Sequence, residues 1–391
     1  MNILYIVNST RVVGGASKSF LTLLYGMAEK GITPHVVTPD KGDMYKMLRE
    51  KGFSVTDINL RMNVYPNLHS VRDALLFLPR LICRRLIEWK ASRRIFRICV
   101  QNRIDLIHAN VSLLSCGIYA SRRLHIPHVL HVREYVDKDF DYHYYPTRQT
   151  YYNTLNSDNF YLICITRDVM EHHRFTGKNA RVVYNGIDLQ GNARHSEFAK
   201  SSFFLFAGRM EPSKNPMQVV EAFRLFCLRH PENNMTLKLA GPVSDTEYFA
   251  GMTDYISKKK LADRVQYLGT RKDIGSLMLD ARAIIVSSDF EAFGRCLPEA
   301  MFYDCLTIGK DYGGTKEQYD NGVTVCGEEI GLRYKTTEEL ADRLSELWPD
   351  IPREYETMKE HANTVVRKLY SKESYINSIY SFYQEILQHK P

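Results

Sequence analysis

The sequence predicts an α/β protein made of two doubly wound domains, each a parallel β-sheet with helices on both faces. Short apolar runs that read as buried strands alternate with helical segments along the chain, which is typical of parallel sheets. The alternation stops where Asn185 and Gly186 give a turn signal and the chain stays polar to Lys200, and it resumes at Phe203. A length of 391 residues also suits two domains.

In the first half, the strands are expected at residues 2–7, 35–38, 53–58, 104–108, 128–132, 160–165 and 181–184. The helices are expected at residues 17–30, 44–51, 71–101, 113–124 and 142–156. Gly31 and Gly52 follow the first two helices, at the position where a left-handed glycine commonly ends a helix. We therefore assign residues 1–185 to the first domain.

In the second half, the strands are expected at residues 203–206, 236–239, 265–268, 283–286 and 306–308. The helices are expected at residues 217–229, 248–259, 274–279, 338–347, 353–369 and 372–388, and residues 313–317 read as a glycine-rich turn. We assign residues 186–371 to the second domain.

Composition is typical of a soluble globular protein, with 44% hydrophobic and 25% charged residues, and we expect a cytoplasmic location. No stretch approaches 18 uncharged apolar residues, so we expect no transmembrane helix. The first seven residues read as a strand rather than a signal peptide. The eight cysteines form no C-x-x-C pair, as expected of reduced thiols that fill a core.

The net charge of +7 comes from one segment, residues 79–103, which has eight Lys or Arg and one acid. As a helix it would have an apolar stripe, made of Ile82, Leu86, Trp89, Phe96 and Val100. One interpretation is a helix packed by this stripe and solvated elsewhere. A nucleic-acid interface is not expected, because no known module accompanies the charge. The third interpretation is an anionic cytoplasmic membrane surface, which attracts basic side chains while Trp and Phe insert at the interface. We expect a packed helix whose basic side faces a membrane.

The strongest candidate site is the strand-to-helix loop from Glu291 to Glu299. It follows the apolar run 283–286, and Pro298 is expected to open a helix, where its missing N–H costs nothing. Backbone amides near a helix start favour anions, and an ionised carboxylate accepts hydrogen bonds from hydroxyls. Phosphate and polyol at one strand end suggest a sugar nucleotide. The alternative is a surface helix with an acidic first turn.

Three further strand ends carry candidate residues. Arg209 and Lys214 follow the run 203–206 and could bracket a diphosphate, although they could also be solvated loop cations. Gly14 and Gly15 follow the first strand and would let the backbone approach a ligand. His131 ends the strand 128–132, where it could position a hydroxyl, and His108 is a weaker competitor. We expect no metal site and no serine nucleophile, since neither motif is present.

Taken in order, these motifs resemble those of the retaining GT-B glycosyltransferases of family four, also called glycosyl transferases group 1. The resemblance covers nearly the whole chain and is strongest from residue 203 to about 317. It includes the Gly14–Gly15 loop, the segment Asn185-Gly-Ile-Asp188, the Arg209 and Lys214 pair, the Glu291 and Glu299 pair, and Gly313-Gly314-Thr315 with Glu317. The segment 326–331 and Arg295 depart from the usual family pattern.

The resemblance implies two Rossmann-like domains facing across a cleft, the first binding acceptor and the second binding a nucleotide-diphosphate sugar, with helix 372–391 crossing back to the first domain. The donor would be linked to UDP or GDP, and the acceptor would be a glycan or a lipid-linked molecule in cell-surface polysaccharide synthesis. The catalytic residues would be His131, Arg209, Lys214 and Glu291. The donor-binding residues would be Gly14, Gly15, Arg209, Lys214, Glu291, Phe293, Gly294, Arg295 and Glu299.

The resemblance implies that Arg209 and Lys214 would hold the diphosphate. Glu291 would contact the donor sugar and Glu299 the ribose, and His131 would orient the transferred sugar. No cofactor or metal is expected. Two rival readings stay open at this point: a GT-B sugar-nucleotide epimerase, and a catalytically idle subunit that binds a nucleotide sugar.

Overall fold

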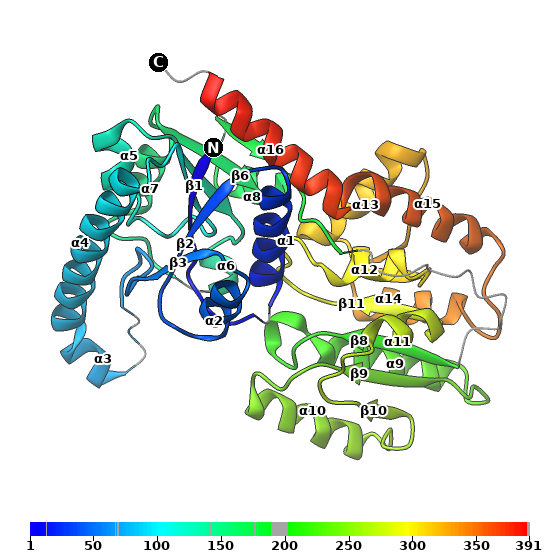
Figure 1. The fold of residues 1–391 in the computed structure, drawn as a ribbon. Helices are drawn as coiled ribbons and strands as arrows, with labels where there is room; N and C mark the ends of the chain where they lie inside the picture. The colour runs from blue at the N-terminus through cyan, green and yellow to red at the C-terminus, as the bar shows by residue number, and fades with distance from the viewer. Residues whose placement is uncertain are drawn as a thin grey trace. The chain divides into compact units, whose positions relative to one another are not determined.

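A computed structural model describes residues 1–12, 14–66, 68, 70–140, 142–175, 177, 179–188 and 202–388 (Figure 1). The chain divides into two compact units, which we describe separately. Unit 1 is Met1–Gly186 with Lys372–Pro391, and unit 2 is Ile187–Ser371. Each unit is built around a parallel sheet flanked by helices, which confirms the predicted α/β fold class.

Unit 1 contains, within the described residues, a seven-stranded sheet in the order β3-β2-β1-β4-β5-β6-β7. The strands are β1 Asn2–Ile6, β2 Thr33–Thr38, β3 Ser54–Asp57, β4 Leu106–Ala109, β5 His128–Val132, β6 Phe160–Cys164 and β7 Ala180–Val182. The helices are α1 Gly15–Glu29, α2 Asp43–Glu50, α3 Val71–Leu75, α4 Phe77–Gln101, α5 Ile118–Leu124, α6 Asp137–Phe140, α7 Arg148–Leu155, α8 Arg167–His172 and α16 Lys372–Gln388.

Successive side chains of β1 point to opposite faces of the sheet, so β1 contributes to the core of unit 1 on both faces. Ile3 and Tyr5 pack with α1 and with α16, the last helix of the chain. Leu4 and Ile6 pack on the other face, with α4. Helices α1 and α16 lie so close that a Cβ at Gly26 would come within 2.1 Å of the Ile376 side chain. The last helix is therefore part of the core of unit 1.

Unit 2 contains, in its described part, a six-stranded parallel sheet in the order β10-β9-β8-β11-β12-β13. The strands are β8 Phe203–Ala207, β9 Thr236–Ala240, β10 Val265–Tyr267, β11 Ala283–Val286, β12 Thr307–Lys310 and β13 Leu332–Tyr334. The helices are α9 Pro216–Arg229, α10 Thr246–Lys258, α11 Ile274–Asp280, α12 Cys296–Phe302, α13 Gly313–Cys326, α14 Thr337–Glu346 and α15 Glu354–Leu369, with a 3-10 turn η1 at Pro212–Lys214.

Several predicted helices were wrong in their bounds. The single helix expected at 71–101 is two helices separated at Leu76, because Pro79 lacks an N–H and its ring would clash with the carbonyl of Leu75 in a continuous helix. The helix expected at 142–156 begins only at Arg148, because Pro146 keeps the preceding residue extended and Thr147 caps the helix by accepting from Thr150 N at 3.1 Å. The helix expected at 113–124 begins at Ile118.

The glycine-rich turn expected at 313–317 is instead the first turn of α13. Both glycines are buried; Gly313 has a φ of 54°, and a Cβ at Gly314 would come within 2.8 Å of the Glu291 carbonyl oxygen. The prediction also missed β13, which is only three residues long.

The packing face of α4 also differs from the prediction. Of the predicted stripe, Ile82, Leu86, Trp89 and Val100 are between 53% and 59% exposed, and only Phe96 packs against the core. The buried face is formed by residues one helical turn apart, namely Ala91, Ile95 and Cys99. The other four residues of the predicted stripe therefore face solvent. Among the described residues, we find no helix with the length and apolar character needed to cross a membrane.

Buried histidines should make unit 1 sensitive to acid. Burial lowers the pKa of His128 to about 3 and that of His173 to about 4, and it holds the pKa of His108 and His131 well below 6.5. In the unfolded chain the pKa of these groups is about 6.5. Below that pH the unfolded state binds more protons than the folded state, so the free energy of unfolding falls. Each histidine contributes about 1.4 kcal/mol per pH unit until its folded pKa is reached.

We therefore predict that the free energy of unfolding of unit 1 falls between pH 6.5 and 5. Unit 2 does not contain these four histidines and should not show this loss. Hydrogen exchange, corrected for the intrinsic rate at each pH, can follow both units in one sample, with unit 2 as the internal control. Protection in unit 1 that does not change over this pH range would contradict the prediction.

Candidate functional site

The sheet of unit 2 places two loops next to each other at the carboxyl ends of its strands. Strand β8 lies between β9 and β11, so the strand order changes direction at β8. In open α/β sheets, ligands bind in the crevice at such a switch point. Arg209 follows β8, and the loop from Ser287 to Arg295 follows β11. These are the loops in which the sequence predicted the site.

Backbone contacts hold the loop after β8. The amide of Gly208 donates to Ala240 O at 2.9 Å, and the amide of buried Met210 donates to Pro242 O at 2.9 Å. A Cβ at Gly241 would come within 1.8 Å of Gly208 O, so only glycine fits there. Between these anchors, the Arg209 side chain is 53% exposed, and its Nη1 lies 2.8 Å from Glu211 Oε2. Arg209 is thus presented to solvent from a fixed backbone.

Lys214 and Glu291 connect the two loops directly. Lys214 Nζ donates to Glu291 Oε2 at 2.6 Å, and the side chains are 22% and 16% exposed. The Ser287 hydroxyl donates to Lys214 O at 2.9 Å, which ties the backbones as well. Asn215 then adopts a left-handed conformation, with φ of 50°, and its side chain caps α9 by accepting from Gln218 N. The lysine is therefore held at the end of β11 by both backbone and side-chain contacts.

Helix α13 supports the loop after β11. The Gly314 amide donates to Glu291 O at 2.7 Å, and a Cβ at Gly314 would lie 2.8 Å from that oxygen. The Gln318 side-chain amide donates to the carbonyl of Phe293. Phe293 is 3% exposed and meets Tyr370 edge-on at 5.7 Å. Gly294 has a φ of 75°, which favours glycine. Phe293 and Gly294 thus shape the loop that presents Glu291.

Helix α12 begins at Cys296, so Pro298 is its third residue rather than its first as predicted. Arg295 immediately precedes the helix, and its Nη2 lies 3.3 Å from Glu299 Oε1 in the first turn. The side chains of Arg295 and Glu299 are 15% and 33% exposed. The arginine that departs from the family pattern therefore holds one oxygen of the predicted ribose-binding carboxylate.

The sequence analysis missed four residues around this loop. Asp289 forms an ion pair with Lys310 at the end of β12, and Asn215 Nδ2 lies 3.4 Å from its carboxylate. Ser287 and Gln318 donate side-chain hydrogen bonds to the backbone carbonyls of Lys214 and Phe293, respectively. Asp289 is not among the predicted site residues, and Lys310 could be associated with it only through the pairing of β11 with β12.

Cations and carboxylates alternate across this edge of unit 2. Arg209, Lys214, Arg295 and Lys310 each have a carboxylate partner, in Glu211, Glu291, Glu299 and Asp289. A diphosphate can compete for the two cations nearest β8, while ionised carboxylates accept from hydroxyls. The described residues contain no group of three or more His, Cys, Asp or Glu placed to hold a metal ion.

In unit 1, Gly14 and Gly15 form the turn between β1 and α1. Gly14 has a φ of 117° and precedes the helix, whose first residue is Gly15. No atom lies within 4 Å of a Cβ built at Gly14, and both glycines are exposed. The positive φ, rather than crowding, therefore explains the need for glycine at residue 14.

His131, at the end of β5, is fully buried. Its Nδ1 lies 3.2 Å from Arg133 Nη2 and 3.4 Å from His108 Nε2. Burial is the largest cause that holds the pKa of His131 well below 6.5, and Arg133 adds to it, so the imidazole is neutral near pH 7. Arg133 also donates to Asn185 Oδ1 at 2.6 Å and to the Tyr375 hydroxyl on α16. The histidine belongs to a buried polar network that includes the first residue of the Asn-Gly-Ile-Asp segment.

Comparison with known proteins now identifies the family. The profile described as Glycosyltransferase Family 4 matches residues 13–190, and the profile described as Glycosyl transferases group 1 matches residues 192–364. The chain belongs to the GT-B glycosyltransferases of the group 1 and family 4 type. The predicted family is confirmed.

The chain is similar to two curated relatives. One is GalNAc-alpha-(1->4)-GalNAc-alpha-(1->3)-diNAcBac-PP-undecaprenol alpha-1,4-N-acetyl-D-galactosaminyltransferase of Campylobacter jejuni, 24% identical over 145 residues, which are 36% of this chain and 39% of the relative. The other is N-acetyl-alpha-D-glucosaminyl L-malate synthase of Bacillus anthracis, 24% identical over 220 residues, which are 54% of this chain and 55% of the relative. The matches therefore span 39% of the first relative and 55% of the second.

Among solved structures, Anabaena HepE in complex with UDP and glucose superposes with a TM-score of 0.73 at 19% identity. The superposition covers 98% of this chain and 99% of HepE. At this identity, the likeness shows the shared GT-B fold.

The contact of α13 with the loop after β11 gives a prediction about Gly314. In Gly314→Ala, the added Cβ would meet the backbone of Glu291 and Ala292 at 2.8–2.9 Å, so we expect the free energy of unfolding to fall by about 1–3 kcal/mol. Gly251→Ala in α10 is the matched control, because a Cβ there meets nothing within 4 Å and should raise stability by about 0.5–1 kcal/mol. Urea unfolding measures both, and equal effects of the two variants would contradict the packing role.

Proposed function

We propose that the chain is a retaining, metal-independent glycosyltransferase that uses a UDP- or GDP-linked sugar. The acceptor would be a glycan or a lipid-linked molecule, reached from the cytoplasmic side in cell-surface polysaccharide synthesis. The proposal rests on the contact of Lys214 with Glu291 at the switch point of unit 2. Arg209 is exposed on the same loop as Lys214. This edge of the sheet therefore has cations that can bind a diphosphate and carboxylates that can accept hydrogen bonds from hydroxyls.

Each residue has a distinct role in this proposal. Arg209 and Lys214 stabilise the diphosphate, where negative charge grows as the glycosidic bond breaks. Glu291 accepts from hydroxyls of the donor sugar, and Glu299, steadied by Arg295, accepts from the ribose. His131, neutral because it is buried, orients the transferred sugar by hydrogen bonding. We assign no enzyme nucleophile.

The comparisons support the proposed classes of donor and acceptor. HepE was crystallised with UDP and glucose, which favours a UDP-sugar as the donor here. The Campylobacter relative acts on an undecaprenol-linked glycan, which favours a lipid-linked acceptor. The Bacillus relative is named for transfer to malate, so a small acceptor is the contrasting case.

Incubation with a panel of sugar nucleotides separates the rival functions. A transferase releases free nucleotide and forms a glycoside when an acceptor is added. An epimerase forms no glycoside and needs no acceptor. An idle binding subunit binds a donor without turnover.

We predict that Arg209→Ala lowers turnover by about 100- to 1,000-fold, because it removes a cation that stabilises charge in the transition state. Arg229→Ala is the matched control, since Arg229 is also a partly exposed arginine of unit 2 in an ion pair, with Asp342 at 2.7 Å. Steady-state release of nucleotide measures both. An unchanged rate for Arg209→Ala, or an equal loss for Arg229→Ala, would remove Arg209 from the site.

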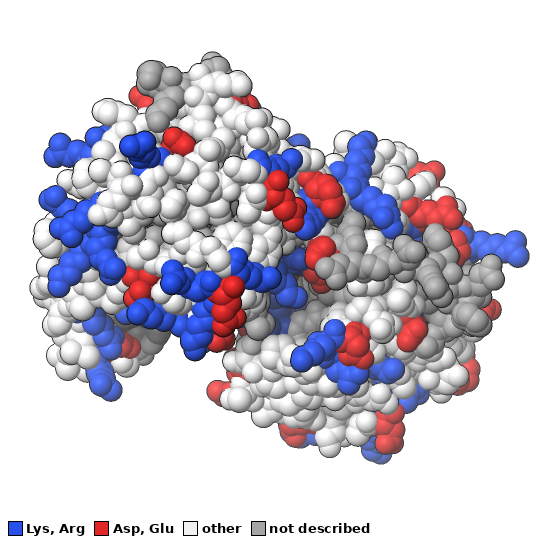
Figure 2. Space-filling view, viewed as in Figure 1, with Lys and Arg blue, Asp and Glu red and all other residues white. Residues whose placement is uncertain are grey.

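We also propose that α4 contacts an anionic membrane. Its residues Leu78, Ile82, Leu86 and Trp89 are 55–65% exposed and recur at spacings of four, four and three, which places them on one side of the helix. Basic side chains, Lys90, Arg93, Arg94 and Arg97, continue along the exposed part of the helix. Figure 2 shows Lys and Arg gathered over the part of unit 1 that carries α4. An apolar stripe beside cations fits the interface of an anionic bilayer.

We predict that vesicle binding requires both anionic lipid and the apolar stripe, and that it weakens with salt. Leu78→Ser should reduce binding by about tenfold, because burial of a leucine side chain contributes about 1.5–3 kcal/mol. Leu228→Ser on α9 is the control, since Leu228 is also 65% exposed. Co-sedimentation with vesicles measures this. Equal binding to neutral vesicles, or equal losses in the two variants, would contradict membrane contact by α4.

A further inference from the structure

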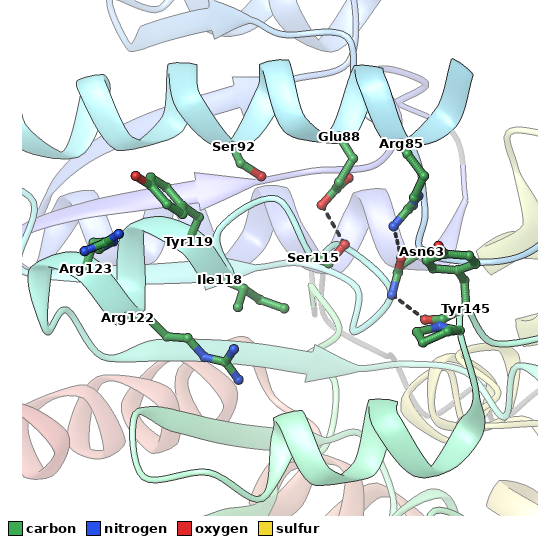
Figure 3. A pocket seen from close by; sticks show the side chains of 11 residues that line it. Asn63, Arg85, Glu88, Ser92, Ser115, Ile118, Tyr119, Arg122, Arg123 and Tyr145 are labelled. Carbon is green, nitrogen blue, oxygen red and sulfur yellow. Dashed lines mark hydrogen bonds between the residues drawn. The ribbon is translucent and has the colours of Figure 1, made fainter. Parts of the chain in front are cut away.

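Unit 1 has a pocket of about 460 Å³ between α4, α5 and the segment at Tyr145 (Figure 3). Its size lies in the range of roughly 300–1,000 Å³ that is usual for small-molecule sites. The pocket walls come from α4, α5 and the connecting loops, and they include none of the predicted site residues. The proposed donor chemistry therefore does not account for it.

One end of the pocket is built around Arg85. Its Nη1 donates to Asn63 Oδ1 at 2.9 Å, and Asn63 Nδ2 donates to Tyr145 O at 2.9 Å. The guanidinium lies 4.3 Å from the centre of the Tyr145 ring. Figure 3 shows this group on the side of the pocket opposite α5. These contacts hold the guanidinium in one orientation while using only one of its nitrogen atoms.

Arg85 and its neighbour Glu88 keep polar atoms that have no hydrogen-bond partner within the described residues. These are Nε and Nη2 of Arg85 and Oε2 of Glu88, which are buried atoms of two residues that line the pocket. The other Glu88 oxygen accepts from the Ser115 hydroxyl at 2.6 Å. Buried polar atoms without partners destabilise a fold. A ligand hydroxyl, which donates and accepts, can satisfy both the guanidinium and the carboxylate after a small movement of these side chains.

The opposite side of the pocket is cationic and aromatic. Arg122 and Arg123 on α5 are exposed, and Arg123 lies 5.9 Å from the centre of the Tyr119 ring. Tyr119 and Ile118 form the wall between the two ends (Figure 3). With Arg85, the lining has three arginines and one acidic residue, Glu88. The local charge therefore favours an anion.

We propose that this pocket binds an acidic saccharide. Hydroxyls of the sugar would meet Arg85 and Glu88, and the acidic group would meet Arg122 and Arg123. As a site for part of the acceptor, it rests on the proposed transferase function and narrows the acceptor to an acidic glycan. Saccharide binding itself can be measured without donor, so the two proposals can fail separately.

Isothermal titration calorimetry on the full chain, without donor or lipid, tests the pocket. The acidic probes are trigalacturonate and sialyllactose, the neutral probe is maltotriose, and inorganic phosphate tests the anion alone. We expect at least one acidic probe to bind ten or more times more tightly than maltotriose and phosphate, because its acidic group and its hydroxyls bind together.

Arg122→Ala combined with Arg123→Ala should weaken that binding at least tenfold. Arg94→Ala combined with Arg97→Ala is the matched control, because it removes the same charge from exposed positions of α4 that do not line the pocket, and it should change binding less than twofold.

Four results would each overturn the inference: no binding of either acidic probe, equal binding of maltotriose, equal binding of phosphate, or equal losses in the two double variants. Donor turnover by the unaltered protein together with any of these results would leave the proposed transferase function standing and remove only the acidic-saccharide pocket.

Discussion

The ion pair between Lys214 and Glu291 is the interaction on which the candidate site depends. It joins the loops after β8 and β11, whose strands are neighbours in the sheet of unit 2. The pair can form because Gly314 lets the backbone at Glu291 lie directly against the start of α13. With Ser287 bonded to Lys214 O, both side chains leave a fixed backbone. Such pre-organisation lets charged groups act on a ligand without reorganisation during the reaction.

The charges of this site are balanced before any ligand arrives. Each of the cations Arg209, Lys214, Arg295 and Lys310 is paired with a carboxylate, so a diphosphate would have to share or replace those partners. This arrangement avoids leaving a partly buried cation uncompensated, which is costly. It also keeps the carboxylates at the edge of the sheet, where their oxygens can accept hydrogen bonds from hydroxyls. The same pairs thus keep the unliganded site stable and ready for a polyhydroxylated ligand.

The sequence predicted the fold class and the family well, because apolar runs mark buried parallel strands and the motif residues stand directly after them. What it could not predict depends on three-dimensional contacts. Gly313 and Gly314 read as a turn because a sequence does not show that the backbone of another loop fills the space of the missing side chain at Gly314. The apolar stripe of α4 was expected to be buried, but Ala91, Ile95 and Cys99 form the packed face, and most of the stripe faces solvent. Lys310 and Asp289 meet only because β11 pairs with β12.

The most direct test of the account compares Glu291→Gln with Glu299→Gln across a panel of UDP- and GDP-sugars. Equilibrium binding and turnover are measured for every donor, with free UDP as the reference ligand that lacks a sugar. The account predicts that Glu291→Gln changes the ranking of sugars while UDP affinity is less affected, and that Glu299→Gln weakens every donor and UDP by a similar factor, because each of them has a ribose. A uniform loss in Glu291→Gln, or a change of sugar ranking in Glu299→Gln, would contradict the division of roles between the two carboxylates.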